Sequence, residues 1–138
     1  MIVGYTAGAF DVFHIGHLNL LKHAKENCDY LIVGVTTDEL ILSTKNKLLL
    51  STLQERMEIL RQIRYVDEVV IQDNLDKVKA WEQYHYDVLF SGDDWKNSDR
   101  WMDYEKRLAL HNVKVIYFPY TKTISSSKIQ EFIKNEGI

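Results

Sequence analysis

Two histidines three residues apart are the first feature of the sequence that could do chemistry. His14 and His17 flank Gly16 at the end of the run GAFDVFHIGH, which begins at Gly8. If a helix begins near Gly16, both imidazoles lie by its N-terminus, where the helix dipole and free N–H groups favour an anion. The small residues of Thr6-Ala7-Gly8-Ala9 also leave backbone N–H groups open to a phosphate. The pattern favours a phosphate-binding turn.

Two further roles for the histidines stay open on these residues alone. Side chains at this spacing could bind a metal, with Asp11 as a third ligand, although a structural zinc needs about four ligands and Cys28 lies far along the chain. The imidazoles could also cap the helix or belong to a polar surface. Neither glycine-rich nucleotide motif, GxGxxG or GxxxxGK[ST], is present in this turn. Gly16 between the histidines favours a ligand that approaches the backbone.

Composition restricts the class of protein. The chain has 138 residues and a formal net charge of −3, which argues against a nucleic-acid surface and against a polybasic membrane arm. No apolar run approaches the roughly 18 residues of a membrane span, and the N-terminus lacks the charged start of a secretory signal. The single cysteine, Cys28, cannot form an intramolecular disulfide. We expect one cytoplasmic domain over residues 1–138, with no nucleic-acid or membrane partner.

Short apolar runs alternate with helical patterns along the chain. The expected strands are Met1–Tyr5, Leu31–Thr36, Val69–Gln72, Asp87–Phe90 and Val113–Phe118. The expected helices are His17–Asn27, Thr52–Ile63, Asp76–Tyr84, Ser98–Leu110 and Ser126–Asn135. This alternation predicts an α/β fold, a Rossmann-like doubly wound parallel sheet in a single domain. Ligands in such sheets bind beyond the carboxyl ends of the strands, so the turn with the histidines is the expected site.

Several motifs in this order resemble those of a known family. GAFDVFHIGHLNLL is similar to the HxGH motif of the nucleotidylyltransferase superfamily. RYVDEV at residues 64–69 and GDDW at residues 92–95 resemble segments of its cytidylyltransferase branch, in particular of bacterial glycerol-3-phosphate cytidylyltransferases. The lysine pair Lys45 and Lys47 and the closing TISSSKI agree, so the resemblance runs from residue 2 to about residue 133. Taken singly, RYVDEV could be a helix end, GDDW a surface turn and the serines a helix cap.

The resemblance implies a role for particular side chains. His14 and His17 would hold the α- and β-phosphates. The implied catalytic residues are these two histidines and the lysines Lys45 and Lys47. The segment Ser43–Ser51 around the lysines is either a lid over the triphosphate or a solvated loop with an apolar tip. The implied nucleotide-binding residues are Ala9, Phe10, Asp11, Gly16, Arg64, Gly92, Asp94, Trp95, Thr121, Ile124, Ser125, Ser126 and Ser127.

The resemblance also implies a reaction: transfer of CMP from CTP to a small phosphate monoester, glycerol 3-phosphate by default, with Mg²⁺ as cofactor. Asp11 is the candidate for positioning Mg²⁺ or a phosphate-binding lysine. A homodimer is implied, and CDP-linked products of this kind feed teichoic-acid or capsule synthesis. The alternatives are another acceptor (a phosphorylated amino acid, amino alcohol or polyol), adenylyl transfer from ATP, and an idle nucleotide-binding module. One departure bears on the substrate: Tyr120 stands where the family has an arginine that helps to hold phosphates.

Overall fold

The computed structural model describes residues 1–119 and 126–136. Its strands are β1 (Val3–Gly8), β2 (Tyr30–Thr36), β3 (Glu68–Gln72), β4 (Val88–Gly92) and β5 (Lys114–Phe118). Its α-helices are α1 (Ile15–Glu26), α2 (Asp38–Lys45), α3 (Leu53–Arg61), α4 (Lys77–Tyr84), α5 (Asp99–Ala109) and α6 (Ser126–Glu136). A short 3₁₀ helix, η1 (Asp93–Trp95), follows β4.

The strands form one sheet in the order β3-β2-β1-β4-β5, and every neighbouring pair is parallel. β1 lies in the middle, where Gly4 is in register with Leu31 of β2 and with Val88 of β4. The strand order reverses beside β1, which makes the carboxyl ends of β1 and β4 the switch point of the sheet. The predicted doubly wound parallel sheet is confirmed.

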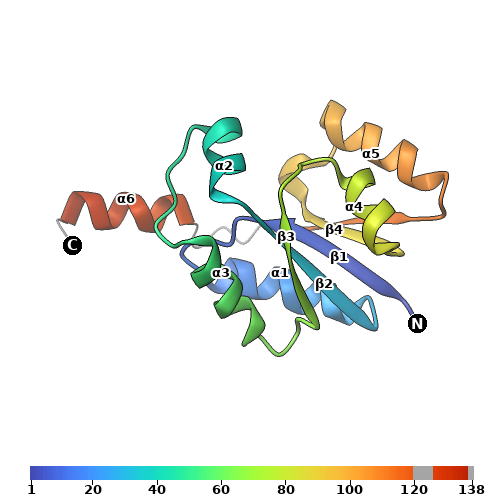
Figure 1. Cartoon of the computed structure of the whole chain (residues 1–138), viewed down its shortest axis with the longest axis horizontal. Helices are drawn as coiled ribbons and strands as arrows, with labels where there is room; N and C mark the ends of the chain where they lie inside the picture. Colours follow the sequence, from blue (N-terminus) through green and yellow to red (C-terminus); the bar gives the residue numbers. More distant parts are fainter. Residues whose placement is uncertain (120–125, 137–138) are drawn as a thin grey trace.

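Helices cover both faces of the sheet. Figure 1 shows α1 and α3 on one side and α4 and α5 on the other. Leu21 of α1 and Leu60 of α3 are fully buried in the first apolar layer. On the opposite face Leu108 of α5 is fully buried, and Val78 of α4 is nearly so. The two layers hold the strands rigidly, so the loops at their carboxyl ends are fixed from both sides.

The structure differs from the sequence prediction most at β1 and α2, while most other predicted boundaries shift by one or two residues. β1 continues to Gly8 rather than ending at Tyr5, because the small residues 6–8 pair in register with β2. α2 was not predicted; it begins after Thr37, whose hydroxyl accepts the Leu40 N–H at 3.2 Å. Consequently the expected loop Ser43–Ser51 is shorter than predicted, since its first three residues are helical. In the part of the chain that the structure describes, no helix is long and apolar enough to cross a membrane.

Candidate active site

Both histidines cap the first turn of α1, as the capping interpretation predicts. His14 is the N-cap residue, and its Nδ1 accepts the Gly16 N–H at 3.0 Å. The His17 Nδ1 in turn accepts the His14 N–H at 3.2 Å. The two rings stack with their centres 4.0 Å apart. The caps therefore fix the position of both imidazoles at the positive end of the helix.

The same bonds determine where each imidazole carries its proton. Since each Nδ1 is an acceptor, a neutral ring has its proton on Nε2 and can donate it outward. Burial lowers the pKa of His14. Burial, followed by the neighbouring His14, lowers the pKa of His17 to about 4, although Asp11 acts in the opposite direction. Near neutral pH the pair consequently offers two neutral N–H donors side by side, without the cost of burying two charges.

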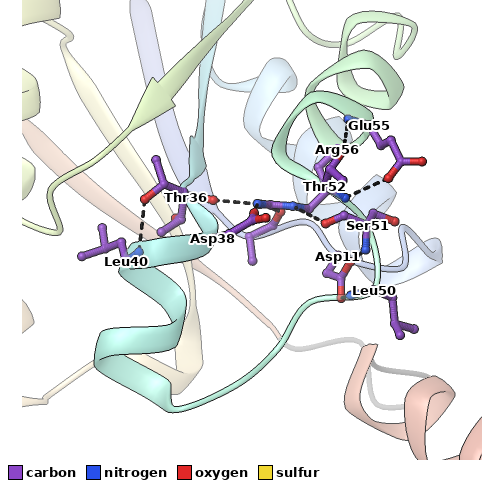
Figure 2. Close-up of polar contacts among 11 residues, drawn as sticks. Asp11, Thr36, Asp38, Leu40, Leu50, Ser51, Thr52, Glu55 and Arg56 are labelled. Carbon is purple, nitrogen blue, oxygen red and sulfur yellow. Dashed lines mark hydrogen bonds and ion pairs between the residues drawn. The ribbon is translucent and has the colours of Figure 1, made fainter.

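Asp11 ties the turn to two other parts of the chain. Its side chain is 2% exposed, and its oxygens accept N–H groups from Leu50 at 2.9 Å, Ser51 at 2.9 Å and Gln130 of α6 at 2.8 Å. Figure 2 shows the two contacts to the segment before α3. Within residues 1–119 and 126–136, no three His, Cys, Asp or Glu side chains converge as metal ligands would. The metal-ligand interpretation has no support in this geometry, and Asp11 acts as a positioning residue.

A buried arginine of α3 holds the turn from the other side. Arg56 is 1% exposed, and its guanidinium donates to the carbonyl oxygens of Ala9 and Thr36, both at 2.8 Å, and of Ser51 at 3.2 Å. It also pairs with Asp38 at the start of α2 (Figure 2). One side chain thus links β1, β2, α2 and α3 at the carboxyl edge of the sheet.

These contacts hold an unusual backbone. Phe10 and Val12 have φ values of 53° and 48°, in the left-handed region that side chains disfavour and β-branched ones most of all. Such a conformation persists only where neighbouring contacts over-determine it, and the bonds to Ala9 and Asp11 lie on either side of Phe10. The turn is therefore built to a fixed shape before any ligand arrives.

A cavity of about 200 Å³ opens beside this turn. It brings His17 together with Lys45 at the end of α2 and with Lys47. Burial and the neighbouring Lys47 both lower the pKa of Lys45. The two lysines carry positive charge, and the imidazole N–H lies at the N-terminus of α1. Together they form a surface that favours anions.

A second cavity, of about 150 Å³, adjoins the first along the edge of the sheet. The two share Ala9, Ile41 and Lys45. The second cavity is also lined by Lys77 at the start of α4 and by Arg100 at the start of α5. Its walls include aromatic side chains and small strand-end residues: Trp95, Trp101, Tyr104, Ala7, Gly8 and Ser91.

Lys77 is buried at 6% exposure, yet its ammonium contacts only neutral oxygens. Its Nζ donates to Gln72 Oε1 at 2.9 Å and to the Leu75 carbonyl oxygen at 3.4 Å. Burial, followed by the charge of Arg100, lowers the pKa of Lys77 to about 8, so the group is still mainly protonated at neutral pH. The described residues place no carboxylate in ion-pair contact with this ammonium. A buried cation that lines a cavity and has no carboxylate partner can bind an anion there.

Most predicted site residues meet at this edge. Ala9, Phe10, Asp11, His17, Lys45 and Lys47 line the first cavity, and Trp95 lines the second. The Lys45 Nζ lies 5.8 Å from the centre of the Trp95 ring. Gly92 and Asp94 belong to the end of β4 and to η1, at the same edge. Gly16 donates its N–H to His14.

Arg64 does not lie with the predicted residues that line the two cavities. It lies between α3 and β3, in a segment whose Asp67 N–H donates to the Leu31 carbonyl oxygen at 3.0 Å, near the start of β2. That is the opposite edge of the sheet, and the nucleotide-binding role of Arg64 stays a prediction.

The remaining predicted residues are near or beyond the described part of the chain. Thr121, Ile124 and Ser125 fall outside the described residues, as does the departure at Tyr120. The backbone of Ser126 and Ser127 begins α6, whose Gln130 contacts Asp11.

Sequence reasoning missed Arg56, Lys77 and Arg100. Arg56 left a readable signal, because it shares the apolar face of its helix with Leu53, Met57 and Leu60. A charged residue on a buried stripe requires partners. Lys77 and Arg100 left no such signal, since each occupies a first helical turn that could equally face water.

Comparison with known proteins agrees with this geometry. A cytidylyltransferase-like family model matches residues 5–132. The chain belongs to the cytidylyltransferase-like family. It is 39% identical over 135 residues to the glycerol-3-phosphate cytidylyltransferase of Bacillus subtilis, covering 93% of this chain and 94% of that one. The FAD synthase of Pyrococcus abyssi is 36% identical over 133 residues, covering 94% and 88%. The family and these relatives make the protein a nucleotidyltransferase.

The fold is also found in solved structures. A lipopolysaccharide core biosynthesis protein from Thermoplasma volcanium superposes with a TM-score of 0.73 at 22% identity, over 90% of this chain and 99% of that one. A pantoate-β-alanine ligase from Francisella tularensis gives 0.65 at 17% identity, over 99% and 70%. At these identities the likeness shows the fold alone.

Proposed function

We propose that the enzyme transfers CMP from CTP to a small phosphate monoester and releases pyrophosphate. The observation that carries the proposal is the pair of adjoining, cation-lined cavities that share Lys45. One lies beside His17 at the switch point, where a triphosphate would bind, and the other contains the buried Lys77. Glycerol 3-phosphate is the first acceptor to test, because several relatives are named for it.

In the proposed step an acceptor phosphate oxygen attacks the α-phosphorus of CTP in line with the leaving group. A new P–O bond forms, the bridging bond between the α- and β-phosphates breaks, and pyrophosphate leaves with that electron pair. The acceptor oxygen is already anionic, so no general base is needed. The Nε2–H groups of His14 and His17 would donate to the α- and β-phosphates, where negative charge develops. Lys77 would hold the acceptor phosphate, with Lys45 between the two substrates.

Mg²⁺ would neutralise charge on the outer phosphates when it binds with the triphosphate. Among the described residues Asp11 is the only carboxylate that lines either cavity, and its oxygens already accept three N–H groups. Asp11 is therefore not expected to bind Mg²⁺ directly. The ion would be held by phosphate oxygens and water, as is usual for Mg²⁺.

We also infer a cytoplasmic homodimer. CTP is a cytoplasmic substrate, and the net charge of −3 favours neither membranes nor nucleic acids. The RYVDEV segment, at the edge of the sheet away from the cavities, is the proposed contact region.

Adenylyl transfer to a flavin is the second candidate, since FAD synthases are among the relatives. The glycerol-3-phosphate cytidylyltransferase of Bacillus subtilis is the more similar relative, at 39% identity against 36% for the FAD synthase of Pyrococcus abyssi.

Pyrophosphate release tests these candidates. The enzyme is incubated with CTP or ATP, each alone, with glycerol 3-phosphate and with FMN. Release that needs CTP and the phosphate monoester supports the proposal, whereas release only with ATP and FMN, or nucleotide binding without turnover, overturns it. His14→Gln and His17→Gln should each lower kcat by about a hundredfold or more, by analogy with the loss of one oxyanion donor. His23→Gln, on the same helix but packed against Phe118, is the matched control.

A further inference from the structure

The second cavity is lined by three cations, one of which it shares with the first cavity. Lys45, Lys77 and Arg100 all line it, and none of its described lining residues is an Asp or a Glu. A phosphate monoester carries up to about two negative charges near neutral pH. Lys77 is buried and would hold that phosphate, and Lys45 is shared with the triphosphate cavity, so the guanidinium of Arg100 is the cation left for a further group of the ligand.

Arg100 is an exposed cation at the N-terminal end of α5. It is the second residue of α5, in the first turn, where the helix dipole disfavours a cation. It also acts against Lys77, whose pKa it lowers. In the described chain Arg100 forms no ion pair, whereas Arg107 on the same helix pairs with Asp76 at 3.5 Å and Asp103 at 3.3 Å.

The carboxylate nearest to Lys77 is already engaged by other groups. Asp76 is the carboxylate that raises the pKa of Lys77, but its Oδ1 accepts the Val78 N–H at 2.9 Å and its Oδ2 faces Arg107. An anion in the cavity would relieve the repulsion between Arg100 and Lys77 and would also satisfy the dipole of α5.

We propose that Arg100 selects an acceptor that carries a carboxylate in addition to its phosphate, as in a phosphorylated hydroxy acid. This inference rests on the proposed function. A guanidinium presents a planar fork that binds both oxygens of a carboxylate, whereas the ammonium groups of Lys45 and Lys77 act as point charges on phosphate. An amino-alcohol phosphate fits less well, because three cations would repel its ammonium group despite the aromatic walls.

The test compares acceptors that differ in one group. 3-Phosphoglycerate has a carboxylate where glycerol 3-phosphate has a hydroxymethyl group, and phosphocholine carries a cation. With CTP, the wild-type enzyme should use 3-phosphoglycerate with a kcat/KM roughly tenfold to a hundredfold above that for glycerol 3-phosphate, the usual range for a hydrogen bond to a charged group. Arg100→Gln should remove most of this preference. Lys106→Gln, which removes an exposed cation from the same helix, should preserve it.

The outcomes separate this inference from the proposed function. Turnover of glycerol 3-phosphate with equal or weaker use of 3-phosphoglycerate overturns the carboxylate preference and leaves cytidylyl transfer standing. A preference that survives in Arg100→Gln, with unchanged circular dichroism, overturns the assignment to Arg100. Better use of phosphocholine contradicts the charge argument. No pyrophosphate release with any acceptor overturns the proposed function and this inference with it.

Discussion

Replacing Arg56 by Met should strongly destabilise the protein, because methionine fills the space but donates nothing. The change leaves the carbonyl oxygens of Ala9, Thr36 and Ser51 without their partner and Asp38 without its cation. A buried polar group left unsatisfied costs about 1–3 kcal/mol. Ser51 and Asp38 are partly open to water, so the loss comes mainly from the other two carbonyl oxygens and is expected to be about 2–5 kcal/mol. Since domains of this kind are stable by about 5–15 kcal/mol, the effect is large.

Urea unfolding followed by circular dichroism measures this loss as the free energy of unfolding. Arg56→Lys should be intermediate, because an ammonium group cannot reach four acceptors in one plane. Arg61→Met is the control: it lies on the same helix, exposed, with a 3.5 Å ion pair to Glu58, and should cost under about 1 kcal/mol. An Arg56→Met variant within about 1 kcal/mol of wild type would refute the view that this side chain holds the carboxyl edge of the sheet together.

Three further predictions concern the site. The pKa of His17 is lowered to about 4 from an ordinary value of 6.5, so the unfolded chain binds more protons between these values. The free energy of unfolding should therefore fall as the pH drops from 6.5 towards 4, with a smaller slope in His17→Gln, and urea titrations at stepped pH would contradict this by showing equal slopes. Lys77→Met should raise the KM for the acceptor more than about tenfold and change the KM for CTP by less than about twofold, whereas Lys79→Met should change neither. A rise confined to the KM for CTP would place Lys77 in the wrong subsite. Removing Mg²⁺ with EDTA should stop pyrophosphate release, and added Mg²⁺ should restore it, with no change in circular dichroism; turnover in EDTA would show that the ion is dispensable.

The parts of the fold that depend on residues close together in the sequence could be predicted from the sequence. The helix of His14 and His17 and the capping box of Thr52 and Glu55 follow from local residue types, and the structure has both. α2 could not be predicted in the same way, because it is short and has only one buried residue, Ile41, to mark an apolar face. β1 was predicted too short, because the pairing of its small residues with β2 is a long-range contact.

The same distinction between local and long-range contacts applies to the site. The sequence determined the turn that carries the histidines, since the glycine, the histidines and the helix start lie within a few residues of one another. Only the tertiary structure brought Arg56, Lys77 and Arg100 to that turn, from α3, α4 and α5. Their convergence depends on the order and register of five parallel strands, which bring residues far apart in the chain to one edge of the sheet. For that reason the reaction class was readable from local motifs, whereas the charge that would select the acceptor became visible only in the folded chain.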